Sequence, residues 1–165
     1  MSKAVFLDRD GVINKDNQYI HKIEDFELKK GIIKVLKHLQ KKYILIIITN
    51  QSGIGRGYYT LDDMQNIHNH LKELMKKENI NFKKIYYCRH APEDNCDCRK
   101  PNITFWEKAK NEFSINMKNS WTIGDKESDC KGGKHAGTKT ILVKSDYCQD
   151  SKCADYKIDE LEKII

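Results

Sequence analysis

The stretch Ala4-Val5-Phe6-Leu7-Asp8-Arg9-Asp10-Gly11-Val12 decides the fold of this chain. Four apolar residues are too few for a helix, and they lead directly into two aspartates and a glycine. This pattern is typical of a buried parallel strand that ends in a turn. If the backbone stays extended, Asp8 and Asp10 project to the same side, where two carboxylates repel each other unless a cation or proton separates them. The alternative interpretation is a strand end followed by an ordinary polar turn.

Further apolar runs alternate with helical patterns along the rest of the chain. The runs that we expect to form strands are 43–48, 84–87, 120–123, 138–143 and a short one near 156–158. The segments that we expect to be helical are 32–39, 60–75, 101–113, a short helix closing at 136–137, and the C-terminal residues. Strands that alternate with helices form a doubly wound parallel α/β sheet. We therefore expect one domain spanning 1–165, which is long enough to bury a core.

The composition favours a folded protein that binds small anions. Charged residues make up 33% of the chain and hydrophobic residues 39%, and the net charge is +6. Because the lysines are scattered beside acidic neighbours, we interpret them as solvated helix faces with a modest preference for anionic ligands. No apolar run is long enough to span a membrane, and the start lacks the pattern of a signal peptide. We expect a cytoplasmic monomer that binds neither nucleic acid nor a membrane.

Polar side chains follow four of the expected elements at the point where each one ends. The residues are Asp8, Asp10, Thr49, Asn50, Lys100, Asp125 and Asp129. Ligands of such sheets bind beyond the carboxyl ends of the strands, so this convergence predicts an enzyme site. An Asp-rich site without a Ser–His pair suits Mg²⁺, while Thr49 and Lys100 suit a phosphate. These are the parts of a phosphoryl-transfer site.

Six cysteines are present, and three of them crowd around one histidine. Cys88, His90, Cys96 and Cys98 supply a full tetrahedral ligand set, so we expect a structural Zn²⁺ rather than a catalytic one. The metal would fix the loop that carries Arg99 and Lys100, which follow at once in the sequence. A redox pair at Cys96 and Cys98 is the weaker alternative. The other three cysteines are most simply free thiols: Cys130, Cys148 and Cys153.

The order of these motifs resembles the haloacid dehalogenase superfamily of phosphatases. The segments that carry the resemblance are Asp8-Arg9-Asp10-Gly11-Val12, Thr49-Asn50-Gln51-Ser52, Lys100 and Gly124-Asp125 with Asp129. They run through nearly the whole chain, and their spacing leaves no room for a separate cap domain. The phrases TNQSGIGRG and CDCRKP are similar to the zinc-containing branch of that superfamily, so the resemblance implies a Rossmann-like core with a zinc-bound loop.

The resemblance also implies a role for each matching residue. Asp8 would attack phosphorus, Asp10 would act as general acid and then base, and Thr49 and Lys100 would hold the phosphoryl group. Mg²⁺ would lie between the Asp8 carboxylate, the Asp10 backbone carbonyl and Asp125. The substrate would be lined by Asp16, Asn17, Gln18, Tyr19, Asn50, Gln51, Ser52, Arg99 and Lys126. Arg99 and Lys126 could instead be surface charges, and Asp129 could cap its helix or hold Lys100.

Within the branch, the likeness is strongest to enzymes that remove the 7-phosphate of a heptose 1,7-bisphosphate for surface polysaccharide synthesis. Three alternatives stay open. The five-residue spacer between His90 and Cys96 is nearer to that of histidinol-phosphate phosphatases. A polynucleotide 3′-phosphatase would share the catalytic motifs but would need a continuous basic groove. A zinc module that binds nucleic acid without catalysis would bind in a salt-sensitive manner and would not depend on Asp8.

Overall fold

The centre of the computed structural model, which describes residues 1–148 and 151–165, is a six-stranded sheet in which every pairing is parallel. The strand order is β3-β2-β1-β4-β5-β6. The bounds are β1 Ala4–Leu7, β2 Ile44–Asn50, β3 Phe82–Cys88, β4 Trp121–Gly124, β5 Lys139–Val143 and β6 Tyr156–Ile158. The expected parallel α/β sheet is therefore confirmed. Because β1 is a buried central strand, Asp8 and Asp10, which follow it, lie at the middle of the carboxyl edge of the sheet.

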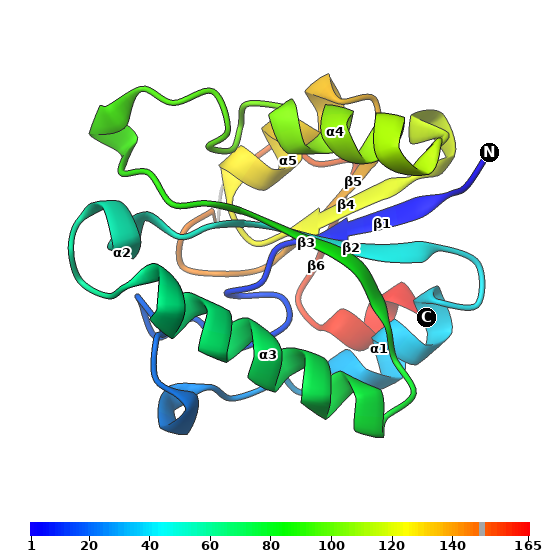
Figure 1. Ribbon diagram of the computed structural model, residues 1–165. Coiled ribbons are helices and arrows are strands. Elements are labelled where there is room, and N and C mark those ends of the chain that lie inside the picture. Colours follow the sequence, from blue (N-terminus) through cyan, green and yellow to red (C-terminus); the bar gives the residue numbers. More distant parts are fainter. Residues whose placement is uncertain (149–150) are drawn as a thin grey trace.

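Helices cover both faces of this sheet, as Figure 1 shows, with α1 and α3 on one face and α4 and α5 on the other. The α-helices are α1 Ile32–Leu39, α2 Ser52–Gly55, α3 Leu61–Lys77, α4 Thr104–Phe113 and α5 Glu127–His135. Short 3₁₀ helices are η1 Ile23–Asp25, η2 Pro92–Asp94, η3 Met117–Asn119 and η4 Leu161–Ile164. Apolar side chains accordingly form two clusters, one on each face of the sheet.

The long helix α3 begins where the sequence indicates. The Thr60 hydroxyl accepts a hydrogen bond from the Asp63 N–H, and the Asp63 carboxylate accepts one from the Thr60 N–H. This reciprocal capping box satisfies two backbone donors that a helix start leaves unpaired. The expected apolar face is also confirmed, and its buried members include Met64, Ile67 and Leu71.

Two expectations about helices were wrong in detail. Helix α4 begins at Thr104 rather than at Pro101, because the Asn102 N–H donates to the Arg99 carbonyl and closes a turn first. The Thr104 hydroxyl then donates to the carbonyl of Asp97, which joins the helix start to the cysteine-bearing loop. In addition, the glycine-rich loop after β2 contains the one-turn helix α2, which the apolar pattern did not indicate.

The expectation that Cys130, Cys148 and Cys153 are all free thiols was also wrong. Cys130 of α5 and Cys153 form a disulfide, while Cys148 is buried and free. The pairing arises because the chain returns beside α5 on its way from β5 to β6. These two cysteines are 23 residues apart, and neither lies in a sequence motif that predicts its disulfide partner.

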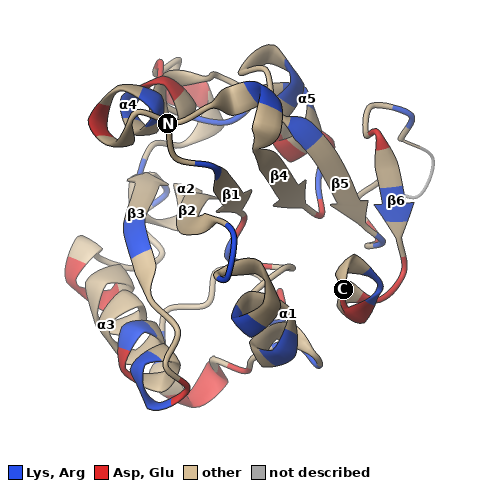
Figure 2. Ribbon diagram, turned by 90° about the vertical axis from the view of Figure 1, so that its right-hand side faces the viewer, with Lys and Arg blue, Asp and Glu red and all other residues tan. Residues whose placement is uncertain are grey.

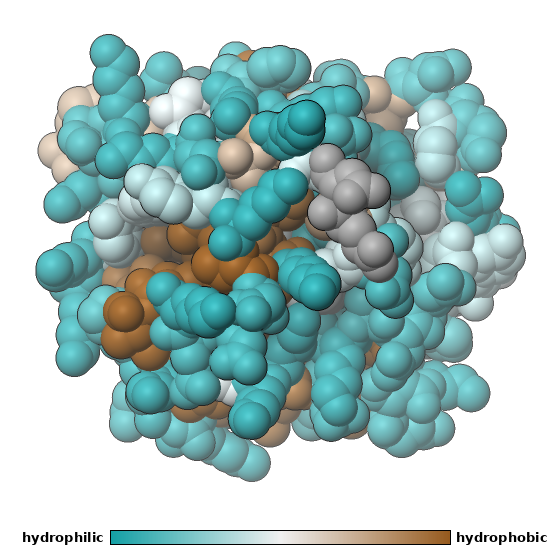
Figure 3. Space-filling model, turned by 180° about the vertical axis from the view of Figure 1, so that it is seen from behind, coloured by the Kyte–Doolittle hydropathy of each residue, from teal (hydrophilic) through white to brown (hydrophobic). Residues whose placement is uncertain are grey.

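The C-terminal residues complete the core on the α1 face. Leu161 is buried in the same apolar cluster as Val35 and Leu36 of α1. Beside it a hollow of about 310 Å³ is lined by apolar side chains, among them Ile141 and Ile158. Figure 3 shows apolar side chains gathered among polar ones on the face seen from behind.

Basic residues are spread over several elements instead of forming one continuous stripe. Figure 2 shows Lys and Arg on α1, α3, α4 and β6, with Asp and Glu between them on α3 and α4. Within the described residues, the helices are all too short or too polar to cross a membrane.

Candidate active site

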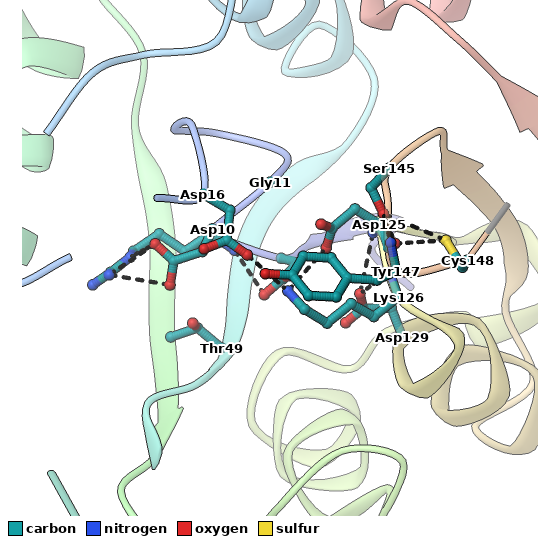
Figure 4. Close-up of polar contacts among 12 residues, drawn as sticks. Asp10, Gly11, Asp16, Thr49, Asp125, Lys126, Asp129, Ser145, Tyr147 and Cys148 are labelled. Atoms are coloured by element: carbon teal, nitrogen blue, oxygen red, sulfur yellow. Dashed lines mark hydrogen bonds and ion pairs between the residues drawn. The ribbon is translucent and has the colours of Figure 1, made fainter. Parts of the chain in front are cut away.

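Three neighbouring strands bring the expected polar residues to one edge of the sheet. Asp8 follows β1, Thr49 lies at the end of β2, and Asp125 follows β4, and these strands are adjacent in the sheet. Parallel strands end at the same edge, so residues more than 100 positions apart meet there. In Figure 4 the labelled side chains from these elements point toward one another.

Three buried carboxylates share this edge. Oxygens of Asp8, Asp125 and Asp129 lie within 4.8 Å of one another, and the residues are only 6%, 1% and 2% exposed. Burial, followed by the charge of Asp129, raises the pKa of Asp8. Burial and the charge of Asp8 raise the pKa of Asp125 to about 8. One Asp125 oxygen, Oδ2, is buried without a hydrogen-bond partner in the described residues. Such a cluster needs a positive charge to be stable in its ionised form.

Lys100 supplies part of that charge. Its ammonium lies 2.9 Å from Asp8 Oδ1 and 2.6 Å from Asp129 Oδ1, and it donates to the Ile48 carbonyl at 2.7 Å. Burial opposes the charged form of Lys100, but Asp129 and Asp8 outweigh it and raise the pKa of the lysine. Asp129 also accepts from the N–H of Lys126, so the two alternatives of capping a helix and holding Lys100 are both realised.

Asp10 has a different environment from Asp8, although only one residue separates them. The fully buried Arg9 donates to Asp10 from both Nε and an Nη, at 3.2 and 2.9 Å, and Asn14 donates at 2.9 Å. Burial opposes ionisation of Asp10, but the Arg9 charge and these hydrogen bonds prevail and lower its pKa. Arg9 is a residue that sequence reasoning left without a role.

A side-chain amide joins Asp10 to the end of β2. Gln51 Nε2 donates to Asp10 Oδ2 at 3.0 Å and to Thr49 Oγ1 at 2.8 Å, while its Oε1 accepts from the Tyr59 hydroxyl at 2.5 Å. The Asn50 side chain also forms a hydrogen bond, because its Oδ1 accepts from the backbone N–H of Lys100 at 3.0 Å. Both amides therefore hold other site residues in place.

Gly11 is required by the same geometry. Its φ is +95°, a conformation that residues with side chains rarely adopt, and an added Cβ would lie 2.1 Å from Asp125 Oδ2. The glycine thus lets the turn after β1 approach the carboxylate that follows β4.

These residues border a cavity of about 310 Å³. Its lining contains most of the residues expected there: Asp8, Asp10, Asp16, Gln18, Tyr19, Asn50, Gln51, Ser52, Arg99, Lys100 and Lys126. Thr49 and Asp125 are buried and do not line it, and Asn17 is exposed outside it. Three lining residues were missed: Tyr59 and Tyr147, which no motif contains, and Ser128, which lies inside the Asp125–Asp129 motif but had no expected role.

The four expected zinc ligands also come together. The sulfur atoms of Cys88, Cys96 and Cys98 lie 3.0 to 3.7 Å apart, and His90 Nδ1 lies 3.6 Å from Cys88 Sγ and 3.4 Å from Cys98 Sγ. These separations are close to the edges of a tetrahedron with metal–ligand bonds of about 2.0 to 2.3 Å. The arrangement can hold a zinc ion, although its sulfur atoms are somewhat closer together than in a filled site.

Comparison with known proteins shows the family of this chain. A family model described as HAD-hydrolase-like matches residues 97–163. A curated phosphatase of Helicobacter pylori (strain J99) is 50% identical over 144 residues, which are 86% of this chain and 83% of the relative. The chain therefore belongs to the haloacid dehalogenase-like hydrolases, and it is a phosphoric monoester hydrolase.

The names of the relatives are more specific. The Helicobacter pylori protein is named D-glycero-β-D-manno-heptose-1,7-bisphosphate 7-phosphatase. A Campylobacter jejuni relative, named for the α form of the same bisphosphate, is 46% identical over 143 residues, or 86% of this chain and 82% of its own. The two relatives thus differ in the anomer that their names specify.

Solved structures share the fold. A D,D-heptose 1,7-bisphosphate phosphatase from B. bronchiseptica, complexed with magnesium and phosphate, superposes with a TM-score of 0.87 at 24% identity, covering 96% of this chain and 93% of that one. A putative HAD-like phosphatase from Mesorhizobium loti gives 0.86 at 26% identity, covering 99% and 84%.

Proposed function

We propose that this enzyme removes the 7-phosphate of D-glycero-D-manno-heptose 1,7-bisphosphate and leaves the heptose 1-phosphate for nucleotide activation in surface polysaccharide synthesis. The relatives named above support the substrate. The observation that carries the reaction is the buried Asp8 carboxylate, which pairs with the Lys100 ammonium and lies within 4.8 Å of a carboxylate oxygen of Asp125. A carboxylate in this position is an available nucleophile beside a place for a cation.

The donor set fits Mg²⁺. Carboxylate oxygens are the ligands that this cation prefers, and the buried Asp125 Oδ2 lacks any other partner among the described residues. We assign the ion to Asp8, the backbone carbonyl of Asp10, and Asp125. When bound, Mg²⁺ would supply the positive charge that lets a phosphate dianion approach a carboxylate.

The reaction proceeds in two displacements at phosphorus. An oxygen of Asp8 forms a bond to phosphorus as the bond to the sugar oxygen breaks, and Asp10 gives its proton to that sugar oxygen. Water then attacks the aspartyl-phosphate, and Asp10 takes the proton of the water. Inorganic phosphate leaves and Asp8 is restored. Arg9 lowers the pKa of Asp10, so Asp10 is ionised before substrate binds. Asp10 takes up its proton as the substrate dianion arrives, because the negative charge of the substrate raises the pKa of Asp10 again.

The remaining residues bind and orient the substrate. Thr49 and Lys100 hold the transferring phosphoryl group, with Lys100 turning from its present partners toward the phosphate oxygens. The rest of the substrate meets residues of four segments, one at the end of each of β1 to β4: Asp16, Asn17, Gln18, Tyr19, Asn50, Gln51, Ser52, Arg99 and Lys126. Arg99 has an Nη1 that is buried without a hydrogen-bond partner in the described residues, so it is free to meet an anionic oxygen.

A structural Zn²⁺ bound by Cys88, His90, Cys96 and Cys98 completes the proposal. The close spacing of the three sulfur atoms and the imidazole nitrogen supports it. All four ligand positions come from protein, so the ion has no place for substrate and serves to fix the loop. Arg99 and Lys100 follow directly, which makes the zinc loop a support for the phosphate site.

Initial rates with Mg²⁺ on a panel of phosphomonoesters test the proposal. The panel contains both anomers of heptose 1,7-bisphosphate, histidinol phosphate and a DNA strand with a 3′-phosphate. We expect kcat/KM to be highest for one of the heptose anomers, and Asp8→Asn to abolish turnover of it. A faster reaction with histidinol phosphate or with the DNA end would overturn the substrate assignment while leaving the chemistry intact.

A further inference from the structure

Tyr147 is a residue of the cavity that belongs to none of the motifs. It follows β5 in the polar tail, lines the cavity, and is 50% exposed. Because the ring borders the cavity and is open to solvent, it is placed where a ligand in the cavity can contact it.

Contacts on both sides of Tyr147 in the sequence hold it in place. The Ser145 hydroxyl and the buried Cys148 thiol both donate to the backbone carbonyl of Asp125, each at 2.7 Å. The Tyr147 N–H donates to the Ser145 oxygen at 3.3 Å. These bonds tie the backbone around Tyr147 to the residue that follows β4, which also belongs to the carboxylate cluster.

The Tyr147 ring also contacts the charged side chain of Lys126. The Lys126 ammonium lies 4.5 Å from the centre of the Tyr147 ring and 3.2 Å from Asp16 Oδ2. In Figure 4 the ring lies across the Lys126 side chain, with its hydroxyl end directed toward the side of Asp16. The ion pair and the ring thus form one continuous wall that joins the loop after β1 to the loop after β4.

We propose that Tyr147 is a specificity-determining residue that contacts the sugar part of the substrate, away from the reacting phosphate. The inference rests on the function proposed above. The polar groups at Asp8, Asp10 and Lys100 recognise phosphate, and they cannot distinguish one phosphomonoester from another. A sugar ring presents C–H faces, against which an aromatic ring packs well. Because the ring is held before binding, little rotational freedom is lost when substrate arrives.

Steady-state kinetics of Tyr147→Ala test this role with two substrates, heptose bisphosphate and acetyl phosphate, which carries no sugar. We expect KM for the bisphosphate to rise about tenfold with kcat within about twofold, as for loss of one aromatic contact. The kcat/KM for acetyl phosphate should stay within about twofold of wild type. Tyr147→Phe keeps the ring and should recover most of the lost affinity.

The matched control is Tyr156→Ala, an equally exposed tyrosine, at 57%, that does not line the cavity. An unchanged KM in Tyr147→Ala, or an equal loss with both substrates, would overturn the inference. If that variant fails to fold, Tyr147→Leu keeps the bulk and asks the same question. A wild-type enzyme that prefers another sugar phosphate overturns the proposed substrate alone, since the same comparison can then be made with the preferred one.

Discussion

The two clusters of candidate metal ligands are built in opposite ways. The sulfur and imidazole ligands lie within a stretch of 11 residues from Cys88 to Cys98, and only Cys88 is fully buried. The carboxylates of Asp8, Asp125 and Asp129 come from distant parts of the chain, are all buried, and meet because parallel strands place them together. The first cluster depends on a loop and the second on the whole sheet.

This difference predicts how each cluster responds to damage. The cysteine loop can lose Cys96 while the sheet stays intact, because Cys96 is only partly buried at the margin of the apolar cluster. In the carboxylate cluster, burial of the charges and repulsion between them destabilise the folded state, and the rest of the fold has to offset this free energy. Removing the Asp8 carboxylate should therefore destroy function without cost to stability, because Lys100 keeps Asp129 as its partner.

The largest effect is expected for Asp8→Asn. The amide cannot act as the nucleophile, so kcat should fall by at least about 10⁴-fold. The melting temperature should not fall, since burial and Asp129 already oppose the charge of Asp8. Turnover and thermal unfolding measure the two effects, with exposed Asp62→Asn as control. A loss of stability equal to that of an ordinary buried substitution would contradict the contrast between the clusters.

A smaller but still large effect is expected for Gly11→Ala. The new Cβ would collide with Asp125 and the backbone would be strained, so kcat/KM should fall about 100-fold and stability by about 2 kcal/mol. Gly57→Ala is the matched control, because Gly57 has φ +76° but nothing within 4 Å of its Cβ. Denaturant unfolding of both variants separates strain from collision. Equal activity of the two would show that Asp125 does not need this close approach.

For the other cluster, Cys96→Ser should have a milder result. We expect bound zinc to be lost and kcat/KM to fall about tenfold, because the loop that carries Lys100 is no longer held. Magnesium dependence should be unchanged, since the sheet positions the carboxylates. Metal analysis and kinetics measure this, with the neighbouring Asp97→Asn as control. Full activity without zinc would refute the supporting role of the loop.

The smallest effect at neutral pH concerns His68, which contacts Arg9 and matters only on acidification. His68 Nε2 is 3.2 Å from Arg9, and burial, followed by the Arg9 charge, lowers the pKa of the imidazole to about 3. Between about pH 3 and 6.5 the unfolded chain therefore binds a proton that the folded chain does not. Stability should fall as pH decreases through that window, by up to about 1.4 kcal/mol per unit.

Replacing His68 by Gln should remove this dependence, whereas replacing the exposed His38 by Gln should preserve it. Chemical denaturation at several pH values between 4 and 7 provides the measurement. The prediction fails if wild type and His68→Gln lose stability equally on acidification.

The sequence was most informative where the physics is local. The apolar run of β1, the capping box of Thr60 and the spacing from Cys88 to Cys98 each depend on neighbours in the chain, and the structure agrees with all three. The meeting of Asp8 with Asp125 could also be predicted, because parallel strands end at one edge.

What the sequence could not indicate depends on packing between distant segments. The disulfide of Cys130 with Cys153 requires the path of the tail beside α5, and no spacing rule specifies it. The hydrogen bonds from Arg9 to Asp10 require the arginine side chain to point into the protein, although arginine side chains usually lie at the surface. Tyr147 reaches the cavity only because two hydrogen bonds hold its loop against a backbone carbonyl.

The place of Leu161 in the core has a consequence for synthesis in the cell. Leu161 packs on the α1 side of the core, among residues that are made more than 100 positions earlier, such as Val35 and Leu36. A ribosome keeps the newest part of a chain inside its exit tunnel, so β1 and α1 emerge well before this partner. The nascent protein must expose this apolar surface until Leu161 has emerged, and it is during that interval that a chaperone would bind it.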